Sequence, residues 1–280
     1  MDQKNIYDNL SEMCSKTTTN LYSTSFSLGI LLFNKEIRSH IYSIYGFVRL
    51  ADEIVDSFHD YKQAELLNDF KQETYKSISN GISLNPILNS FQKTVREYNI
   101  PHDLINSFLL SMEMDLHKSE YSNEEVNDYI YGSAEVVGLM CLRVFCAKND
   151  DLCNQLSPYA RSLGAAFQKV NFLRDLKDDY QVLGRSYFAE INFNGLDQNS
   201  KKKVEANIQM DFQDALIGIK KLPASSRFGV YLAYIYYYSL FKKIKGMHFE
   251  AIAHERVRIS NYNKYLLLVS SWFRYKLNLV

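Results

Sequence analysis

Two stretches of the chain place carboxylates at helical spacing. A 3.6-residue period puts positions i, i+4, i+7 and i+11 on one face of a helix, and positions i, i+3, i+7 and i+11 do the same. The first spacing is that of Tyr45, Arg49, Asp52 and Asp56. The second spacing is that of Gln168, Asn171, Asp175 and Asp179. One such aspartate pair is usually a solvated helix face, but two polar stripes embedded in apolar sequence indicate a shared site.

Two acidic stripes that face each other inside a helical protein need cations between them, because desolvated like charges a few ångströms apart are costly. Mg²⁺ prefers carboxylate oxygens and completes its coordination with phosphate oxygens, so we expect Mg²⁺, with Mn²⁺ as a substitute. Arg49, Arg174 and Arg185 would hold the remaining phosphate charge, since a planar guanidinium engages two oxygens at once. The stripes therefore predict a metal-assisted site for a diphosphate.

The elements that must position these stripes are predicted to be long helices. Each of the four prolines, at positions 86, 101, 158 and 223, stands where a helical pattern can begin after a break. No run of alternating residues bounded by turn signals requires a sheet, and residues 183–200 read as a loop. The expected helices cover residues 34–58, 62–79, 86–98, 101–118, 123–148, 158–183, 201–221, 225–245 and a last stretch from 259. The prediction is an all-α protein with one domain over residues 1–280.

Composition narrows the function. The 280 residues include 32 basic and 32 acidic side chains, and this zero net charge argues against a nucleic-acid partner. The aromatic share of 14% suits an apolar ligand or a large core. The four cysteines form no CxxC pair, and the sequence shows no signal peptide and no membrane span. We expect a cytoplasmic protein, with peripheral membrane contact left open and the oligomeric state not predicted.

Several motifs resemble those of the squalene and phytoene synthase family, in the same order. The resemblance covers roughly residues 15 to 275. The matching segments are residues 23–26, 41–49, 51–56, 131–134 with 137–138, 164–168, 171–175 with 179, 184–188 and 256–260. This likeness implies an isoprenoid synthase fold, in which helices surround a central cavity and two aspartate motifs face each other at its mouth.

The resemblance also implies a reaction. Family members join two prenyl diphosphates head to head through a cyclopropyl diphosphate; phytoene and dehydrosqualene synthases then lose a proton, whereas squalene synthases take a hydride from NADPH. We expect two geranylgeranyl diphosphates to give phytoene, in carotenoid biosynthesis and without NADPH. The alternative is a squalene or dehydrosqualene synthase that uses two farnesyl diphosphates.

Residue roles carry over from the resemblance position by position. The implied magnesium ligands are Asp52, Asp56, Asn171, Asp175 and Asp179. The diphosphate and its metal cluster would be contacted by Arg49, Gln168, Arg174 and Arg258. The reacting centre would be lined by Tyr45, Tyr129 and Tyr187, and the rest of the substrate site by Ser23, Ser25, Phe26, Ala134, Val137 and Gly138. By geometry alone, either Asp178 or Asp179 could be the magnesium ligand, and the family spacing favours Asp179. The proton acceptor is also left open, because either a tyrosine or the released diphosphate could take the proton.

Other readings compete with some of these assignments. Ala134 and Gly138, at i and i+4, open a groove for a prenyl chain or allow close helix packing. The tyrosines at 234 and 236–238 surround their helix, which favours a packing role. A di-iron carboxylate bundle would need ExxH pairs, but the Glu and His residues at 113/117 and 250/254 are four apart. A His-Asp phosphohydrolase lacks convincing partner histidines, and a non-enzymatic relative would be expected to have lost the four aspartates.

Overall fold

The computed structural model describes residues 3–117, 121–181, 198–248, 251–252 and 256–277. Within these ranges there is no strand, and the all-α prediction is confirmed. The elements are α1 (Gln3–Tyr22), α2 (Thr24–Leu31), α3 (Lys35–Ser57), α4 (Gln63–Asn80), α5 (Pro86–Glu97), α6 (His102–His117), α7 (Asn123–Ile130), the π-helical turn η1 (Tyr131–Glu135), α8 (Val136–Phe145), α9 (Asp150–Gln181), α10 (Gln198–Lys221), α11 (Ala224–Lys245) and α13 (Asn261–Lys276).

Local signals explain many helix ends. The Asn85 side chain accepts hydrogen bonds from the backbone of Ile87 and Leu88 at 3.0 and 3.4 Å, and Pro86 follows as the first residue of α5. Gly81 ends α4 at φ 70°, a left-handed conformation that suits glycine. These ends lie within one or two residues of the predicted ones.

Pro158 does not begin a helix, contrary to our prediction. Helix α9 begins at Asp150, eight residues earlier, and continues through Pro158. The Asn149 side chain accepts a hydrogen bond from the Leu152 backbone at 3.0 Å, and two aspartates in the first turn favour that end of the helix dipole. The start signal at residue 149 therefore prevails, although an interior proline removes one backbone hydrogen bond.

Helix α1 lacks the apolar stripe by which helices are recognised in sequence. Its buried residues are Ser11, Ser15 and Thr19. Ser15 Oγ lies 2.7 Å from Ser90 Oγ of α5, and a Cβ added to Gly46 of α3 would lie 2.9 Å from the same Ser15 oxygen. Small hydroxyl side chains thus let α1 pack closely on α3 and α5, and our prediction did not include this helix.

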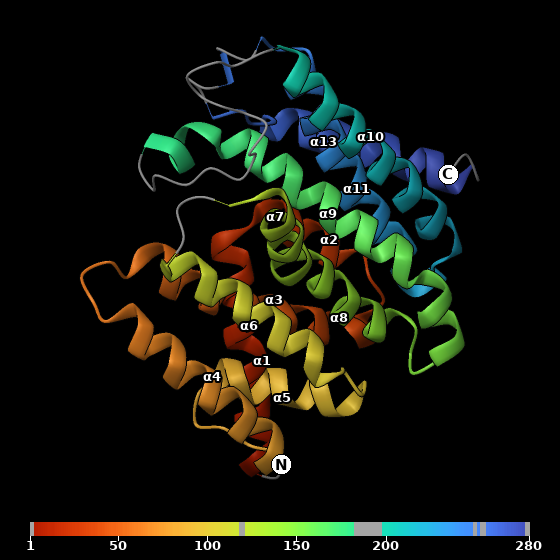
Figure 1. Cartoon of the computed structure of the whole chain (residues 1–280). Coiled ribbons are helices and arrows are strands. Elements are labelled where there is room, and N and C mark those ends of the chain that lie inside the picture. The colour runs from red at the N-terminus through yellow and green to blue at the C-terminus, as the bar shows by residue number, and fades with distance from the viewer. Residues whose placement is uncertain (1–2, 118–120, 182–197, 249–250, 253–255, 278–280) are drawn as a thin grey trace.

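Most of the helices share one hydrophobic core, whose buried residues extend along the chain from Ile30 to Val257, and α7 packs on α9 in a second, smaller cluster. Phe47 of α3 lies at its centre, with its ring stacked 3.9 Å from that of Phe91 and 5.4 Å from that of Phe108. Helices α4, α5 and α6 lie on one side of α3, and α9, α10, α11 and α13 lie towards the opposite end of the molecule (Figure 1). In the described part of the chain, no helix combines the length and apolar character that crossing a bilayer requires.

Candidate active site

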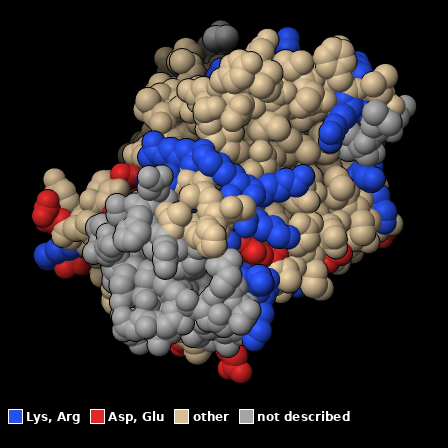
Figure 2. Space-filling model, turned by 90° about the horizontal axis from the view of Figure 1, so that it is seen from above, with Lys and Arg blue, Asp and Glu red and all other residues tan. Residues whose placement is uncertain are grey.

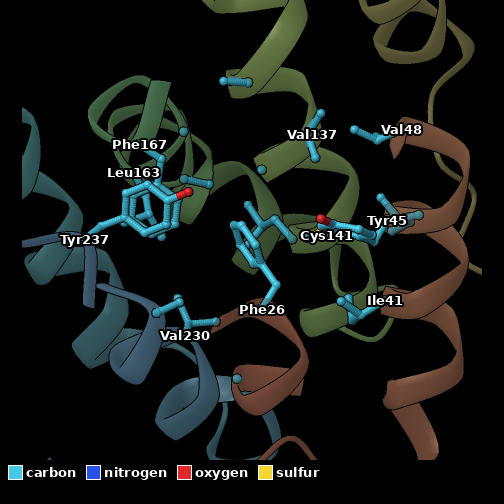
Figure 3. A pocket seen from close by; sticks show the side chains of 18 of the residues that line it. Phe26, Ile41, Tyr45, Val48, Val137, Cys141, Leu163, Phe167, Val230 and Tyr237 are labelled. Atoms are coloured by element: carbon cyan, nitrogen blue, oxygen red, sulfur yellow. The ribbon is translucent and has the colours of Figure 1, made fainter. Parts of the chain in front are cut away.

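A pocket of about 530 Å³ opens among helices α2, α3, η1–α8, α9, α10 and α11 (Figure 3). Along α3 its lining changes from Ile41 and Ile44 to Arg49 and Asp52, a distance of about 16 Å for 11 residues at 1.5 Å per residue. Along α9 it likewise changes from apolar to polar towards the C-terminal end of the helix. The polar lining residues at this end are Arg49, Asp52, Gln168, Asn171, Arg174 and Arg256. The pocket is therefore charged at one end and apolar over the rest of its length.

Arg49 organises the α3 side of the charged end. Its guanidinium donates to the Glu53 carboxylate and lies 4.0 Å from Asp52 Oδ2. The same guanidinium lies 4.3 Å from the centre of the Tyr22 ring. Burial raises the pKa of Glu53, but the hydrogen bonds from Arg49, Ser57 and Tyr22 and the positive charge of Arg49 together outweigh burial, so the pKa is lowered. Glu53 therefore stays ionised and helps to orient Arg49.

Asp52 differs from Glu53 because its pKa is raised instead of lowered. Burial, reinforced by the negative charges of Asp56 and Asp115, raises the pKa of Asp52 to about 7, and Arg49 offsets only part of this. A carboxylate in this state gains stability from an additional cation nearby. The Tyr45 hydroxyl, one helical turn away from Arg49, is hydrogen-bonded to Ser23, yet burial raises the pKa of Tyr45 to about 12, so it remains a proton donor.

The α9 side holds a network of opposite charges. Arg174 donates to Asp175 through Nε at 3.0 Å and through Nη2, and Arg256 Nε lies 2.8 Å from Asp175 Oδ1. The hydroxyl of Tyr237, from α11, is hydrogen-bonded to Asn171 and Arg174. Desolvation raises the pKa of Tyr237, so its hydroxyl stays neutral. Asp175 thus orients two arginines whose other donors remain near the pocket.

Aromatic rings form the wall next to the charged end. Phe167 and Tyr237 stack with their ring centres 3.9 Å apart, and Phe26 lies 6.0 Å from Tyr237 and 5.7 Å from Tyr45. Figure 3 shows Phe26 between this stacked pair and the Tyr45 side of the pocket. Ring faces attract positive charge, so this wall suits a substrate that becomes cationic.

Comparison with known proteins identifies the family. The model of the squalene/phytoene synthase family matches residues 19–193, which is more than half of the chain. The chain belongs to this family. Among curated relatives it is 26% identical to phytoene synthase 1 of Solanum lycopersicum over 280 residues, covering 94% of this chain and 66% of that protein. It is 25% identical to 4,4'-diapophytoene synthase of Staphylococcus haemolyticus, covering 66% of this chain and 64% of that protein.

Solved structures show the same fold. A dehydrosqualene synthase in complex with ligand matches with a TM-score of 0.83 at 18% identity, over 96% of this chain and 98% of that one. A squalene synthase of Alicyclobacillus acidocaldarius matches with a TM-score of 0.74 at 20% identity, over 86% and 95%. The predicted membership of the squalene/phytoene synthase family and its isoprenoid synthase fold are confirmed. The chain spans 60–66% of the length of six of the plant phytoene synthases that it matches and 90% of the length of a seventh.

The structure gathers most of the predicted site residues around this pocket of the squalene/phytoene synthase fold. The predicted residues that line it are Ser23, Phe26, Tyr45, Arg49, Asp52, Ala134, Val137, Gly138, Gln168, Asn171 and Arg174. Ala134 lies in the π-helical turn η1, and a Cβ added to Gly138 would lie 2.9 Å from the Ala160 carbonyl oxygen. Both readings of Gly138, a groove for substrate and close packing of α8 on α9, thus agree with the structure.

Several other predicted residues lie outside the pocket lining. Asp56 is exposed one turn beyond Asp52, Ser25 lies half-buried on α2, and Asp175 is paired with two arginines. Tyr129 donates to Asp115 Oδ2 at 2.9 Å within a separate small cluster. Arg258 is exposed, and Arg256 lines the pocket instead. Asp178 and Asp179 lie in α9 without described side chains, and Arg185 and Tyr187 lie outside the described residues.

Our reading of the sequence missed Tyr237, to which it gave a packing role. The signal is the spacing of small residues one and two turns before it: Gly229, Ala233 and Tyr237 follow at i, i+4 and i+8, and all three line the pocket. This spacing puts the three residues on one face of α11, and that face lines the pocket. Arg256 was within a recognised motif, but its neighbour Arg258 was chosen for the diphosphate role.

The described residues can be tested for their fit to Mg²⁺. Asn171 Oδ1 is buried without a hydrogen-bond partner, and Asp52 is a carboxylate whose pKa is raised by burial and by the negative charge of Asp56. Both are oxygen donors of the type that Mg²⁺ prefers, so the site fits the ion. No group of three or more His, Cys, Asp or Glu side chains at metal-binding distances occurs among the described residues, which exclude the Asp179 side chain.

Proposed function

We propose that this chain joins two molecules of geranylgeranyl diphosphate head to head and forms phytoene by way of a cyclopropyl diphosphate. The observation that carries the proposal is the pocket itself, with arginines and Asp52 at one end and apolar walls over the rest. A prenyl diphosphate has the same division between a charged head and an apolar tail. Two farnesyl diphosphates, giving squalene or dehydrosqualene, are the alternative substrates.

The chain's own residues supply binding and charge stabilisation in this proposal. Arg49, Arg174 and Arg256 would bind diphosphate oxygens, Arg49 and Arg174 in orientations set by Glu53 and Asp175. Asp52, Asp56 and Asn171 would hold Mg²⁺, which when bound supplies positive charge to the departing diphosphate. The Tyr45 and Tyr237 hydroxyls, both protonated at neutral pH, would donate hydrogen bonds at the same end of the pocket.

The apolar part of the pocket would direct the carbon skeleton. Phe26, Phe167 and Tyr237 present ring faces where an allylic cation would form after the diphosphate leaves. An apolar wall also keeps water from capturing this cation, so attack by the double bond of the second substrate can compete. Loss of a proton would then give the cyclopropyl diphosphate. Departure of its diphosphate, rearrangement of the carbon skeleton and loss of a second proton would give phytoene without NADPH.

The choice of the longer substrate rests on sequence relatives. Seven plant phytoene synthases match 86–96% of this chain at 26–28% identity. The relative from Staphylococcus haemolyticus, named as a diapophytoene synthase, matches a smaller share of it at 25%. The names of these relatives favour phytoene, and direct product analysis must test this choice.

The experiment is an incubation of purified protein with farnesyl or geranylgeranyl diphosphate, Mg²⁺ or Mn²⁺, and with or without NADPH, followed by identification of the hydrocarbon. We expect phytoene from geranylgeranyl diphosphate, no requirement for NADPH, and loss of activity with a chelator. Squalene or dehydrosqualene from farnesyl diphosphate alone would establish the alternative. Release of a prenyl alcohol and no coupled product would refute the condensation.

A further inference from the structure

Helix α13 exposes a continuous apolar stripe on its outer side. The exposed large apolar side chains on this helix and at its end follow at i, i+3, i+4, i+10, i+11 and i+15, which is one face of a helix. They are Tyr262, Tyr265, Leu266, Trp272, Phe273 and Leu277, each between 45% and 71% exposed. Monomeric proteins rarely leave so many neighbouring aromatic and aliphatic side chains in water without a role for them.

The orientation of α13 is fixed by contacts on its inner side. The Tyr236 hydroxyl of α11 donates to the Lys264 carbonyl at 2.9 Å, the rings of Phe228 and Tyr275 lie 4.9 Å apart, and Ser271 is buried. These contacts hold the apolar stripe outward. Helix α11 also lines the pocket through Val230 and Ala233, so it lies between the pocket and α13.

The charged residues around the stripe are all basic. From Arg256 to Leu277 the chain contains no Asp or Glu, and Arg274 and Lys276 are exposed next to the aromatic residues. The Lys276 ammonium lies 6.0 Å from the centre of the Trp272 ring. Viewed from the end of the molecule where α10, α11 and α13 lie, a broad uncharged area is bordered by Lys and Arg side chains (Figure 2).

We propose that the outer face of α13 docks on the surface of a lipid bilayer that contains anionic headgroups. Tyr and Trp rings with polar edges suit the boundary between headgroups and acyl chains, while lysine and arginine attract anionic lipids. A second copy of this chain fits less well, because a two-fold contact would bring two basic helices together. The inference rests on this surface and does not depend on which prenyl diphosphate the pocket accepts.

The chain carries its own reporter for the test, because its single tryptophan is Trp272. Purified full-length protein is mixed with phosphatidylcholine vesicles with or without about 30% phosphatidylglycerol, and Trp272 fluorescence and vesicle flotation are recorded. We expect flotation and a blue shift with the anionic vesicles. Quenching by brominated lipids is expected as well, because an interfacial helix enters the bilayer by about 5–10 Å.

Variants separate the apolar and the electrostatic contributions. Arg274→Gln with Lys276→Gln should lower the partition coefficient about 25-fold, since each basic residue near an anionic surface contributes about a fivefold factor. Phe273→Ser should also reduce flotation. The matched control is Leu10→Ser with Met13→Ser on α1, where exposed apolar side chains are likewise removed; its flotation should equal that of the unchanged protein.

Three outcomes would overturn the proposal. These are no flotation with anionic vesicles, flotation with an unchanged Trp272 spectrum, and a blue shift of Trp272 that follows protein concentration in buffer without vesicles. The last result would assign the face to a second copy of the chain. Because vesicle binding is measured without substrate, failure here is distinct from failure of the proposed condensation.

Discussion

The Asp52 carboxylate lies where its negative charge is poorly compensated. Its side chain is 30% exposed, and its pKa is raised to about 7 by burial and by the nearby Asp56. A carboxyl group whose pKa is higher in the folded than in the unfolded protein reduces stability as pH rises from about 4 to 7, and the full cost persists above that range. Such a residue is retained for a function that needs its charge.

We predict that Asp52→Asn stabilises the metal-free protein and removes its activity. At pH 8 the free energy of unfolding should rise by about 1 kcal/mol after allowance for partial exposure, with no gain at pH 4. Hydrocarbon formation should fall by roughly 100-fold or more. Denaturant unfolding with chelator at both pH values and product assays with Mg²⁺ measure the two effects. The exposed Asp69→Asn on α4 is the control, and equal behaviour of the two variants would contradict the prediction.

Tyr237 contributes through both its ring and its hydroxyl. Tyr237→Phe retains the stack on Phe167 but removes the hydrogen bonds to Asn171 and Arg174. Hydrogen bonds to charged groups contribute about 1.5–3 kcal/mol, so we predict a loss of at least about tenfold in kcat/KM. The melting temperature should change little.

Steady-state kinetics with a prenyl diphosphate substrate tests the role of the Tyr237 hydroxyl. Tyr238→Phe is the matched control, because the Tyr238 hydroxyl lies 3.4 Å from the Gln209 side chain and Tyr238 does not line the pocket. If both variants keep full activity, Tyr237 has only the packing role that its sequence context indicated.

At the scale of elements, His40 joins α3 to α5. Its Nδ1 lies 3.0 Å from Thr94 Oγ1, its Nε2 lies 3.7 Å from Glu97 Oε1, and its ring centre lies 4.7 Å from that of Tyr98. Burial lowers the pKa of His40 and outweighs the opposite effects of Glu97 and Glu12; Lys93 lowers it further. The folded protein therefore favours the neutral imidazole.

Because the pKa of His40 is lowered in the folded protein, we predict that the free energy of unfolding depends on pH. As pH falls through about 6.5, the unfolded chain binds a proton on His40 that the folded chain resists, so the free energy of unfolding should decrease. His40→Gln should flatten this part of the profile. Denaturant unfolding between pH 5 and 8 measures both curves, and an unchanged slope in the variant would assign the dependence to other groups.

The elements differ in how far the sequence could predict them. Helices α3 and α9 were found because their polar stripes and apolar neighbours repeat at helical spacing, and the same stripes indicated the site. Helix α1 was missed because hydroxyl groups, including Ser15, mediate its packing. The π-helical turn that contains Ala134 interrupts a stretch predicted as one helix, since one extra residue in a turn leaves no composition signal. Tyr237 was misjudged because only the assembled pocket distinguishes it from its neighbouring tyrosines.

At the scale of the whole molecule, helices from distant parts of the chain determine the length of the pocket. Its charged end is formed by α3 and α9, while its far end is closed by Phe33 from the segment after α2 and Phe145 from α8, whose ring centres lie 5.2 Å apart. We therefore expect product length to depend on side chains far apart in sequence that meet only in the folded protein.

The size of the side chain at position 134 should affect the width of the pocket, because Ala134 lines it. We predict that Ala134→Phe shortens the accepted substrate or abolishes product, because a ring in place of a methyl group fills part of the cavity. Far-ultraviolet circular dichroism should be unchanged. Gas chromatography of products from farnesyl and geranylgeranyl diphosphate measures the preference, and an unaltered preference would show that Ala134 has only a packing role against α9.

Phe33 lies at the end of the pocket opposite Asp52. Replacing it with a smaller side chain should lengthen the accepted substrate, whereas Ala134→Phe should shorten it. The Phe33 ring is 6% exposed and contacts Phe145, and a Cβ added to Gly229 would lie only 2.2 Å from Phe33 Cε1. Phe33→Leu would remove part of this barrier without leaving the larger cavity of an alanine. We predict a higher ratio of geranylgeranyl to farnesyl diphosphate turnover.

Competition between the two substrates in one reaction measures this ratio directly. Phe70→Leu is the matched control, because Phe70 is 5% exposed in the core but does not line the pocket; its substitution should lower stability comparably without changing the ratio. A shift of the same size in both variants would mean that general loosening of the helices sets chain length. A shift confined to Phe33→Leu would locate that control at the closed end of the pocket, opposite the Asp52 carboxylate.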